Sequence, residues 1–386
     1  MNGQNIQFQK NKESNLKILT FFIMFLMSMS AMATNKIYVT QAGDSLVFDV
    51  LQDGDGNKIG NSTTASTASG SATNFNIDQV GDSNIITFDI HGDSFTGVWS
   101  TTGNSNNIDF NCDSADATSG CDNVHATITF AGNSQDIDID VGLTTSKSGD
   151  TADIDIVGAT NTDSTVVAAT IDGTSVVLTL TIDGDSNNYL INIDDNGDVN
   201  GHTLIMTQTG ITADVDVTQS GSYDDSATVV TTGDSQNIDI TQTAGGTVTM
   251  TTSGSTSAAV KTVNINQTGH ATFNTDGTIL GQTSSGLAGA GGTYDIDQTS
   301  TGTINLDVDG ASANVSIEQT SSGTVSIDAA GASFTADIDQ DNASTLELHH
   351  DGASADYVIL QTGGSGDIID LEVNGASANV DIIQRD

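Results

Sequence analysis

The sequence predicts an all-β protein, a β-solenoid of about 16 coils in which two parallel sheets face each other. Three observations predict this fold: a repeat of 21 to 23 residues, an alternation of apolar and polar residues within each repeat, and 41 glycines but no proline among 386 residues. Two independent series of residues share the repeat. They are the glutamines Gln298, Gln319, Gln340, Gln361 and Gln384 and the glycines Gly310, Gly331, Gly352 and Gly375.

Each repeat is expected to contain two strands and two turns. Val315, Ile317 and Gln319 alternate with polar residues, and this period of two is typical of a strand with one buried face. A turn at 321–323 and a second strand over 325–329 complete the unit. Because two short strands cannot bury an apolar face alone, the repeats must stack. In such a stack a proline would break a hydrogen bond at almost any strand position, which explains its absence.

Looser copies of the half-repeat recur every 11 to 13 residues upstream, for example at Gly81, Gly92 and Gly103. Three segments interrupt the pattern and are expected to be longer turns or excursions from the scaffold. They are residues 61–73, the segment between the two cysteines, and the Gly/Ser-rich residues 276–292.

The repeated glutamines are expected to form a ladder inside the solenoid. One glutamine per coil places its amide about 4.8 Å from the next, so donor and acceptor groups can link along the axis. The alternative is a solvent-facing polar residue at a turn, but the glutamines share the parity of Val and Ile. Such a ladder would also penalise register slips, because a shifted coil would place an amide against an apolar side chain.

The N-terminus has the pattern of a secretory signal peptide, with cleavage expected after Ala33. Three lysines precede an apolar run over 18–29, and Ala31 and Ala33 form an A-x-A arrangement. The run is short for a membrane span, which argues against a retained membrane anchor. We therefore expect a signal peptide, residues 1–33, and one secreted repeat domain, residues 34–386, that is not inserted in the membrane after cleavage.

Cys112 and Cys121 are the two cysteines of the chain. In an exported protein an even number of cysteines favours a disulfide, here closing a short loop. A metal site is the alternative, but two thiols supply only half of a tetrahedral shell and no histidine lies at ligand spacing. We expect a disulfide, and neither a metal nor a cofactor.

The charge of the chain argues against nucleic acid as a partner. Lys and Arg number 8 against 50 Asp and Glu, a net charge of −42 at pH 7, whereas phosphate contacts need clustered basic residues. Many acidic residues, such as Asp297, Glu318 and Asp337, fall on the outward parity of the strands. They are expected to oppose premature aggregation, with faster assembly at high salt or acidic pH. Calcium binding is the alternative, but the glycine-rich nonapeptide of calcium-binding β-rolls is absent.

The repeats resemble those of curlin, the subunit of bacterial curli fibres. The resemblance rests on the Ile-x-Gln-x-Gly-x-x-Asn pattern of 77–84 and on shorter copies such as 263–269 and 315–320, and it extends over nearly all of 34–386. It implies a secreted, curlin-like solenoid that polymerises into functional amyloid of the extracellular matrix. Partners would be further copies of the chain, with a nucleator or other curlin-like subunits.

We expect a structural protein, the subunit of an amyloid-like filament in a fimbrium at the cell surface or in the biofilm matrix. Solenoids that do not polymerise protect their ends with polar caps or a helix. Here the first strand pattern, 37–41, closely follows the expected cleavage site, and the last, 380–384, ends near the C-terminus. These ends leave no room for caps, so subunits are expected to stack head to tail.

The alternative is a non-polymerising adhesin or fibre-tip protein that uses the solenoid as a stalk. Contact would then come from the irregular segments around Trp99, between Cys112 and Cys121, and over 276–292. Ice binding is a weaker alternative, because it requires outward rows of Thr, and the outward positions are largely Asp and Ser.

An enzyme is not expected. No nucleophile, phosphate-loop or zinc motif stands out in the sequence. The local histidine pair is His349 and His350, of which the second lies on the inward parity of its strand. We therefore interpret His350 as a core residue and not as a ligand or a base.

Overall fold

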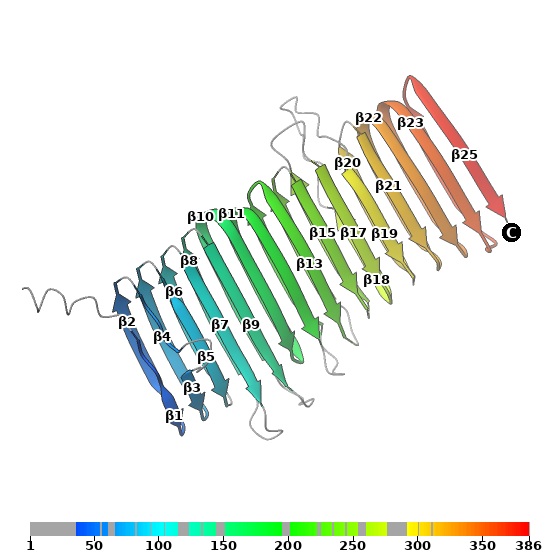
Figure 1. The fold of residues 1–386 in the computed structure, drawn as a ribbon. Helices are drawn as coiled ribbons and strands as arrows, with labels where there is room; N and C mark the ends of the chain where they lie inside the picture. The colour runs from blue at the N-terminus through cyan, green and yellow to red at the C-terminus, as the bar shows by residue number, and fades with distance from the viewer. Residues whose placement is uncertain are drawn as a thin grey trace, which may run out of the picture.

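The computed structural model is a β-solenoid, as the sequence predicts: parallel coils stack along one axis (Figure 1). It describes residues 36–385 except 55, 61–65, 82, 93, 104, 115–122, 133, 144–150, 195–200, 222–224, 234, 244, 254–259, 276–291, 300 and 310–311. The expected signal peptide lies outside the described residues. Within them, no helix is long and apolar enough to cross a membrane.

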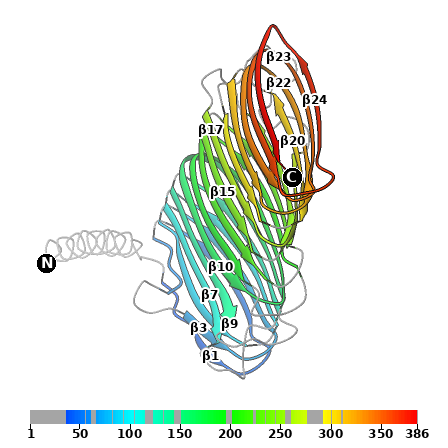
Figure 2. The same ribbon diagram turned by 90° about the vertical axis from the view of Figure 1, so that its right-hand side faces the viewer.

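Two parallel ladders of strands face each other across the core, and in Figure 2 they are seen obliquely from one end of the solenoid. The first ladder contains β1 (Thr40–Ala42), β3 (Ser66–Ser69), β5 (Ile85–His91), β7 (Ser105–Ser114), β9 (Ser134–Leu143), β13 (Thr212–Ser220), β15 (Ser235–Gln242), β17 (Val260–Gln267), β19 (Gly292–Gln298), β21 (Ser312–Gln319) and β25 (Ser377–Arg385). The second contains β2 (Val47–Asp53), β4 (Thr73–Val80), β6 (Phe95–Thr102), β8 (Asn123–Ala131), β12 (Thr203–Thr209), β14 (Asp225–Thr232), β16 (Gly245–Ser253), β18 (His270–Thr275), β20 (Gly302–Asp309) and β24 (Ile368–Asn374). Four long strands take part in both ladders: β10 (Thr151–Asp172), β11 (Ser175–Asp194), β22 (Gly323–Asp341) and β23 (Thr345–Thr362).

The solenoid has fewer turns than the about 16 expected. The C-terminal coils keep the 21-residue spacing of the predicted repeat, as between Gln298 and Gln319. Elsewhere the spacing is longer: Gln79 lies 27 residues after the glutamine on which it stacks, and Gln298 lies 31 residues after its own. The 31-residue coil includes the predicted excursion over 276–292. Insertions at the corners therefore lengthen the coils without altering the strands.

The core consists of the inward side chains of both ladders. Within the described strands the burial alternates residue by residue, as in β21, where Ala313, Val315, Ile317 and Gln319 are buried and the residues between them are exposed. The C-terminal coils are filled mainly by Ile, Val, Leu and Ala. The N-terminal coils contain a cluster of rings in contact, Phe75, Phe88, Phe95, Trp99 and Phe110.

The expectation that Trp99 lies in an irregular contact segment is wrong. Trp99 is an inward residue of β6, fully buried and stacked on Phe95 at a ring-centroid distance of 5.7 Å. Gly97 makes this possible, because a Cβ there would lie 2.6 Å from the Phe95 ring and 2.9 Å from the Trp99 ring. The glycine that disturbs the alternation in the sequence thus provides space for the rings.

The segment 61–73 is also more regular than expected. Residues 66–69 form β3, which pairs with β1 and β5, and Thr73 begins β4. Residues 61–65 lie outside the described part of the chain. Of the predicted excursion over 276–292, only Gly292 is described, as the first residue of β19.

Stacked glycines form the corners of the coils. A Cβ on Gly81, which has a φ of 150°, would lie 1.8 Å from the carbonyl oxygen of Gly54 in the preceding coil. A Cβ on Gly352 would lie equally close to the carbonyl oxygen of Gly331. Glycine recurs at the repeat spacing because the backbones approach too closely at the corners for any side chain.

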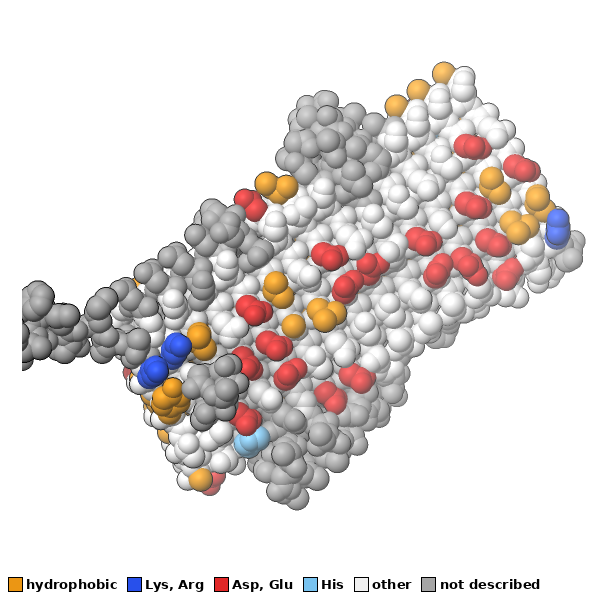
Figure 3. Space-filling view, in the orientation of Figure 1, with side chains coloured by type: hydrophobic (Ala, Val, Ile, Leu, Met, Phe, Trp, Pro, Cys, Tyr) orange, Lys and Arg blue, Asp and Glu red, His pale blue; other side chains and the backbone are white. Residues whose placement is uncertain are grey.

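Outward side chains form rows along the axis, and acidic residues are prominent in them (Figure 3). Asparagines interrupt several of these rows. Asn237 Nδ2 donates to Asp214 Oδ1 at 2.8 Å, and Asn379 Nδ2 donates to Asp356 Oδ1 at 2.9 Å, in each case from the following coil. Asn76 donates to Asp49 in the same way, whereas Asn107 donates in the opposite direction, to Asp136 of the following coil. The amide satisfies a carboxylate that would otherwise face a like charge.

Some carboxylates lack this relief because they stack on another carboxylate. Asp138 of β9 stacks directly on Asp109 of β7. Partial burial, together with the charges of neighbouring aspartates, chiefly Asp140, raises the pKa of both carboxyls above the ordinary 3.8. Because the folded protein disfavours their charged forms, these groups reduce stability at neutral pH, and the penalty disappears as the pH falls through the raised pKa.

We predict that Asp138→Asn raises the free energy of unfolding at pH 7 by a few tenths to about 1 kcal/mol, because an amide facing Asp109 removes the repulsion and can donate to it. The gain should vanish in acid, where the aspartate is already neutral. Chemical denaturation at several pH values measures both effects. Asp155→Asn is the control, since Asp155 stacks on Thr127 and Thr179. An equal gain in the control would contradict this explanation.

Candidate assembly interface

Eight stacked glutamines form a continuous hydrogen-bonded ladder inside the C-terminal half of the solenoid. In each step, the side-chain Nε2 donates to Oε1 of the preceding glutamine at 2.8 to 3.4 Å. All of them except the last are fully buried. In chain order they are Gln219, Gln242, Gln267, Gln298, Gln319, Gln340, Gln361 and Gln384.

The five glutamines of the predicted series are the last five rungs of this ladder. The prediction did not include the first three rungs, Gln219, Gln242 and Gln267, because the spacing is irregular there. From Gln219 to Gln298 the successive rungs are 23, 25 and 31 residues apart. The common signal is the strand context, a glutamine two residues after an inward Ile or Val, and not a fixed period. The ladder therefore extends through most of the C-terminal half.

A second, shorter amide arrangement lies in the N-terminal coils. Gln79 Nε2 donates to Gln52 Oε1 at 2.6 Å, in the ladder opposite to the one that holds the long series. Asn84, the asparagine of the curlin-like pattern, donates to the carbonyl oxygens of Gln79 at 3.1 Å and of Thr102 at 3.2 Å. The asparagine thus fastens the turn to its own coil and to the next one.

The C-terminal end of the solenoid presents two strand edges. Among the described strands, β24 and β25 each pair only with β23. The inward residues of β24, Ile369 and Leu371, are only partly buried, and those of β25, Val380 and Ile382, are 40% and 43% exposed. No described residue covers these side chains or the outer edges of the two strands. Within the described residues the apolar core is therefore only partly covered at this end.

The N-terminal end also presents two strand edges and partly buried apolar side chains. Within the described residues, β2 pairs only with β4 and β1 only with β3. The inward residues Phe48 and Val50 of β2 are partly buried, whereas their counterparts one coil further, Phe75 and Ile77, are fully buried. In the described structure the partly buried members of the core are found at the two ends.

His350 is a core residue, as the sequence predicts. It is fully buried in β23, stacked on Phe334 at 5.6 Å and edge-on to Tyr357 at 6.1 Å. Burial lowers its pKa below the ordinary 6.5, and the charge of His349 acts in the same direction, while the Gly331 backbone and Asp351 oppose the shift. His349 points outward and bonds Asp328 through Nδ1 at 2.9 Å, an interaction that raises the pKa of His349.

The predicted disulfide stays a prediction, because Cys121 lies outside the described residues. Cys112 is an inward, fully buried residue of β7. In the column that contains the long glutamine ladder, Val141 of the next coil stacks on it. Among the described residues, no group of three or more His, Cys, Asp and Glu side chains is placed to hold a metal ion.

Comparisons with known proteins give no further guide to function. No family model matches the chain, and neither a curated protein nor a solved structure is detectably similar to it. Function is therefore inferred from the repeats and the geometry of the chain itself.

Loss of an inner rung should destabilise the solenoid more than loss of the terminal rung. Gln319→Leu leaves a buried donor on Gln340 and a buried acceptor on Gln298 without their ladder partners, which we expect to cost about 2 to 4 kcal/mol. Gln384→Leu removes two bonds of 3.2 Å at an exposed position, to Gln361 Oε1 and to the carbonyl oxygen of Asp367, and should cost less than about 1 kcal/mol. Hydrogen exchange of the C-terminal coils measures the difference. Equal effects would contradict the ladder's contribution to stability.

The C-terminal coils should lose stability in mild acid. The lowered pKa of His350 means that the folded state favours the neutral ring. The contribution of this preference to the free energy of unfolding is complete above pH 6.5 and is lost as the pH falls through the lowered pKa. Hydrogen exchange in β22 and β23, compared at pH 7.5 and pH 5, should show this loss in the wild type. It should be absent in His350→Leu and present in the control His125→Leu, whose side chain is 53% exposed. Unchanged protection in the wild type would contradict the prediction.

Proposed function

We propose that this protein is the secreted subunit of an amyloid-like filament, in which copies stack head to tail through the open ends of the solenoid. The observation that supports this function best is the match between the two ends. Both are strand edges with a partly uncovered apolar core, and both belong to the same pair of ladders. Resemblance of the repeats to curlin supports the same conclusion.

The register of the coils specifies how two copies would join. Followed from coil to coil, the column that begins at Phe48 ends at Ile369, so these two residues would meet at a junction. Two residues further, Val50 would meet Leu371. β2 and β24 are both seven residues long, so their edges can pair over their full length. The junction would bury the apolar side chains left open in a single copy.

The glutamine ladder can continue through the same junction. In the other ladder of strands, Gln41 of β1 lies in the column that ends at Gln384. Each rung donates to the preceding coil, and no described residue supplies a donor to Oε1 of Gln384, the last described rung. Gln41 of an added copy would take that place, exchanging its local bond to the carbonyl oxygen of Gly43 for the intermolecular one. A continuous amide ladder is typical of stacked parallel strands in amyloid.

Charge opposes this junction, which gives the assembly a dependence on salt. Asp49 follows Phe48 and Asp370 follows Ile369, so two outward carboxylates would stack at the new contact. Exposed charges of like sign repel less as the ionic strength rises. Elongation should therefore be faster at high salt, and salt-independent kinetics would count against this register.

The proposal is tested by placing a charge in the open core. Leu371→Lys would bury an unpaired ammonium at the junction, so we expect elongation to fall by at least about 100-fold. Val358→Lys introduces the same charge on an outward position of β23, where the native side chain is 44% exposed, and is the matched control. Electron microscopy and fibre diffraction, with reflections near 4.8 and 10 Å, report filament formation.

Two results would overturn the proposed function. The first is a wild-type protein that stays a monodisperse monomer at high concentration. The second is a Leu371→Lys variant that forms filaments as quickly as the Val358→Lys control.

A further inference from the structure

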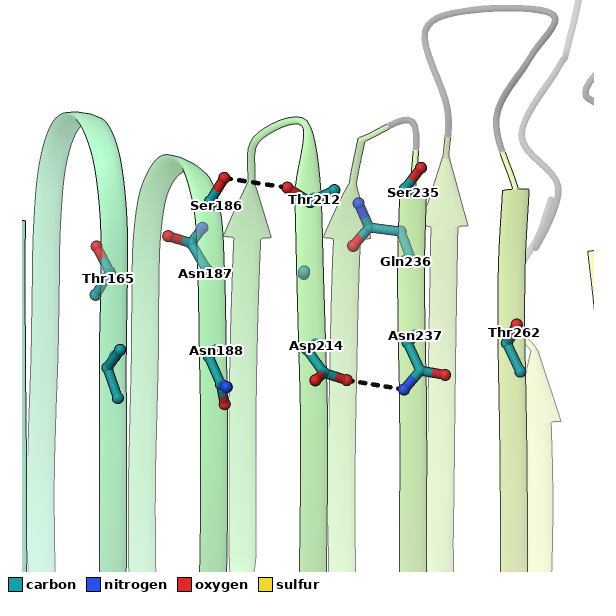
Figure 4. Close-up of a pocket in the computed structure, with 12 residues that line it drawn as sticks. Thr165, Ser186, Asn187, Asn188, Thr212, Asp214, Ser235, Gln236, Asn237 and Thr262 are labelled. Carbon is teal, nitrogen blue, oxygen red and sulfur yellow. Dashed lines mark hydrogen bonds between the residues drawn. The ribbon is translucent and has the colours of Figure 1, made fainter.

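A groove crosses the first ladder in the middle of the solenoid, lined by residues from both the outward and the inward parity of its strands. It has a volume of about 510 Å³ and runs over five neighbouring strand segments, from the second half of β10 through β11, β13 and β15 to β17, near the turns that precede them (Figure 4). Five strands at ~4.8 Å spacing span about 19 Å. This length suits an extended ligand lying along the axis of the solenoid, across the strands.

The groove presents rows of hydroxyl and amide groups. Ser186, Thr212 and Ser235 form one row at the turns, where the Ser186 and Thr212 hydroxyls are 3.3 Å apart (Figure 4). A second row contains Asn188 and Asn237 with one carboxylate between them, Asp214, which accepts a bond of 2.8 Å from Asn237. On a chain with a net charge of −42, this groove has a single charged group among the described residues that line it.

Two buried amides in the groove have unused hydrogen-bonding capacity. Gln236 is 3% exposed, and neither Nε2 nor Oε1 has a partner among the described residues. Asn187 is 4% exposed; its Nδ2 donates to the Gly184 carbonyl at 2.9 Å, while its Oδ1 has no partner in the described structure. Buried polar atoms are normally satisfied, so these atoms indicate a partner that is itself polar. Gln236 offers one donor and one acceptor, which is the combination that a hydroxyl group needs.

We propose that this groove binds a neutral oligosaccharide. An anionic ligand is disfavoured, because no basic residue is among the described residues that line the groove and Asp214 would repel it. A divalent cation would need several carboxylates, and the one present is already bonded to Asn237. A chain of sugars supplies hydroxyls that donate and accept, and its C–H surfaces can lie on Val166, which is 39% exposed. Binding is expected to be weak, since no aromatic ring lines the groove for stacking.

The test is binding of fluorescently labelled neutral hexasaccharides, cellohexaose and maltohexaose, to the full chain, followed by fluorescence anisotropy. At least one of them should bind, and Asn237→Ala should weaken that binding at least about tenfold. Asn379→Ala is the matched control, because Asn379 makes the same bond to the aspartate of the preceding coil but lies far outside the groove. It should bind as the wild type does.

Two further variants separate binding from folding. Gln236→Leu removes the buried amide and should abolish binding; Asn188→Ala changes only an exposed side chain and should weaken binding with an unchanged circular dichroism spectrum. The proposal is overturned if neither neutral hexasaccharide binds, if hexagalacturonate binds as well as they do, or if Asn379→Ala loses as much affinity as Asn237→Ala. It does not depend on filament formation, and the assay applies equally to monomers and filaments.

Discussion

The structure depends on one constraint, the parallel pairing of each strand with the equivalent strand of the next coil. At a spacing of about 4.8 Å, each residue stacks on the residue at the same position one coil away, so the side chains form columns along the axis. The hydrogen bonds, charges and volumes of the side chains in one column must therefore be compatible at that distance. Glutamines link amide to amide, asparagines donate to aspartates, and at the corners the backbones approach so closely that only glycine fits. Proline is excluded because it removes a donor from the ladder.

A column can change its chemistry along the axis if the change is compensated. The column that becomes the glutamine ladder contains Cys112, Val141, Ile171 and Ile193 before Gln219. Gln219 therefore stacks on the apolar side chain of Ile193, and no amide of the preceding coil accepts a hydrogen bond from its Nε2. Its Nε2 instead donates to the carbonyl oxygen of Ser226 at 3.3 Å. The ladder can begin in mid-solenoid because the carbonyl of Ser226, near the start of β14, takes the place of the missing rung.

The same constraint explains how much of the structure the sequence predicts. The alternation of apolar and polar residues along a strand is visible in any single repeat, so the β-solenoid and the inward position of Gln319 and His350 could be predicted. The lengths of the coils could not be predicted, because the corners accept insertions of up to ten residues without altering the strands that they join. The Asn–Asp pairs were missed for that reason, since their partners lie 23 to 29 residues apart. Trp99 was misplaced because the space that Gly97 leaves for the Phe95 and Trp99 rings is visible only in the packed core.

Acid acts on this solenoid in two opposite ways. Partial burial and neighbouring aspartates raise the pKa of carboxyls such as Asp138 and Asp339 above 3.8, so protonation relieves the repulsion in the outward rows. Burial lowers the pKa of His350 from 6.5, so the core favours the neutral ring and acid destabilises β22 and β23. These strands support β24 and β25, the edge at which a further copy would add. Acid therefore relieves the repulsion that opposes stacking and, at the same time, weakens the end that would receive a new copy.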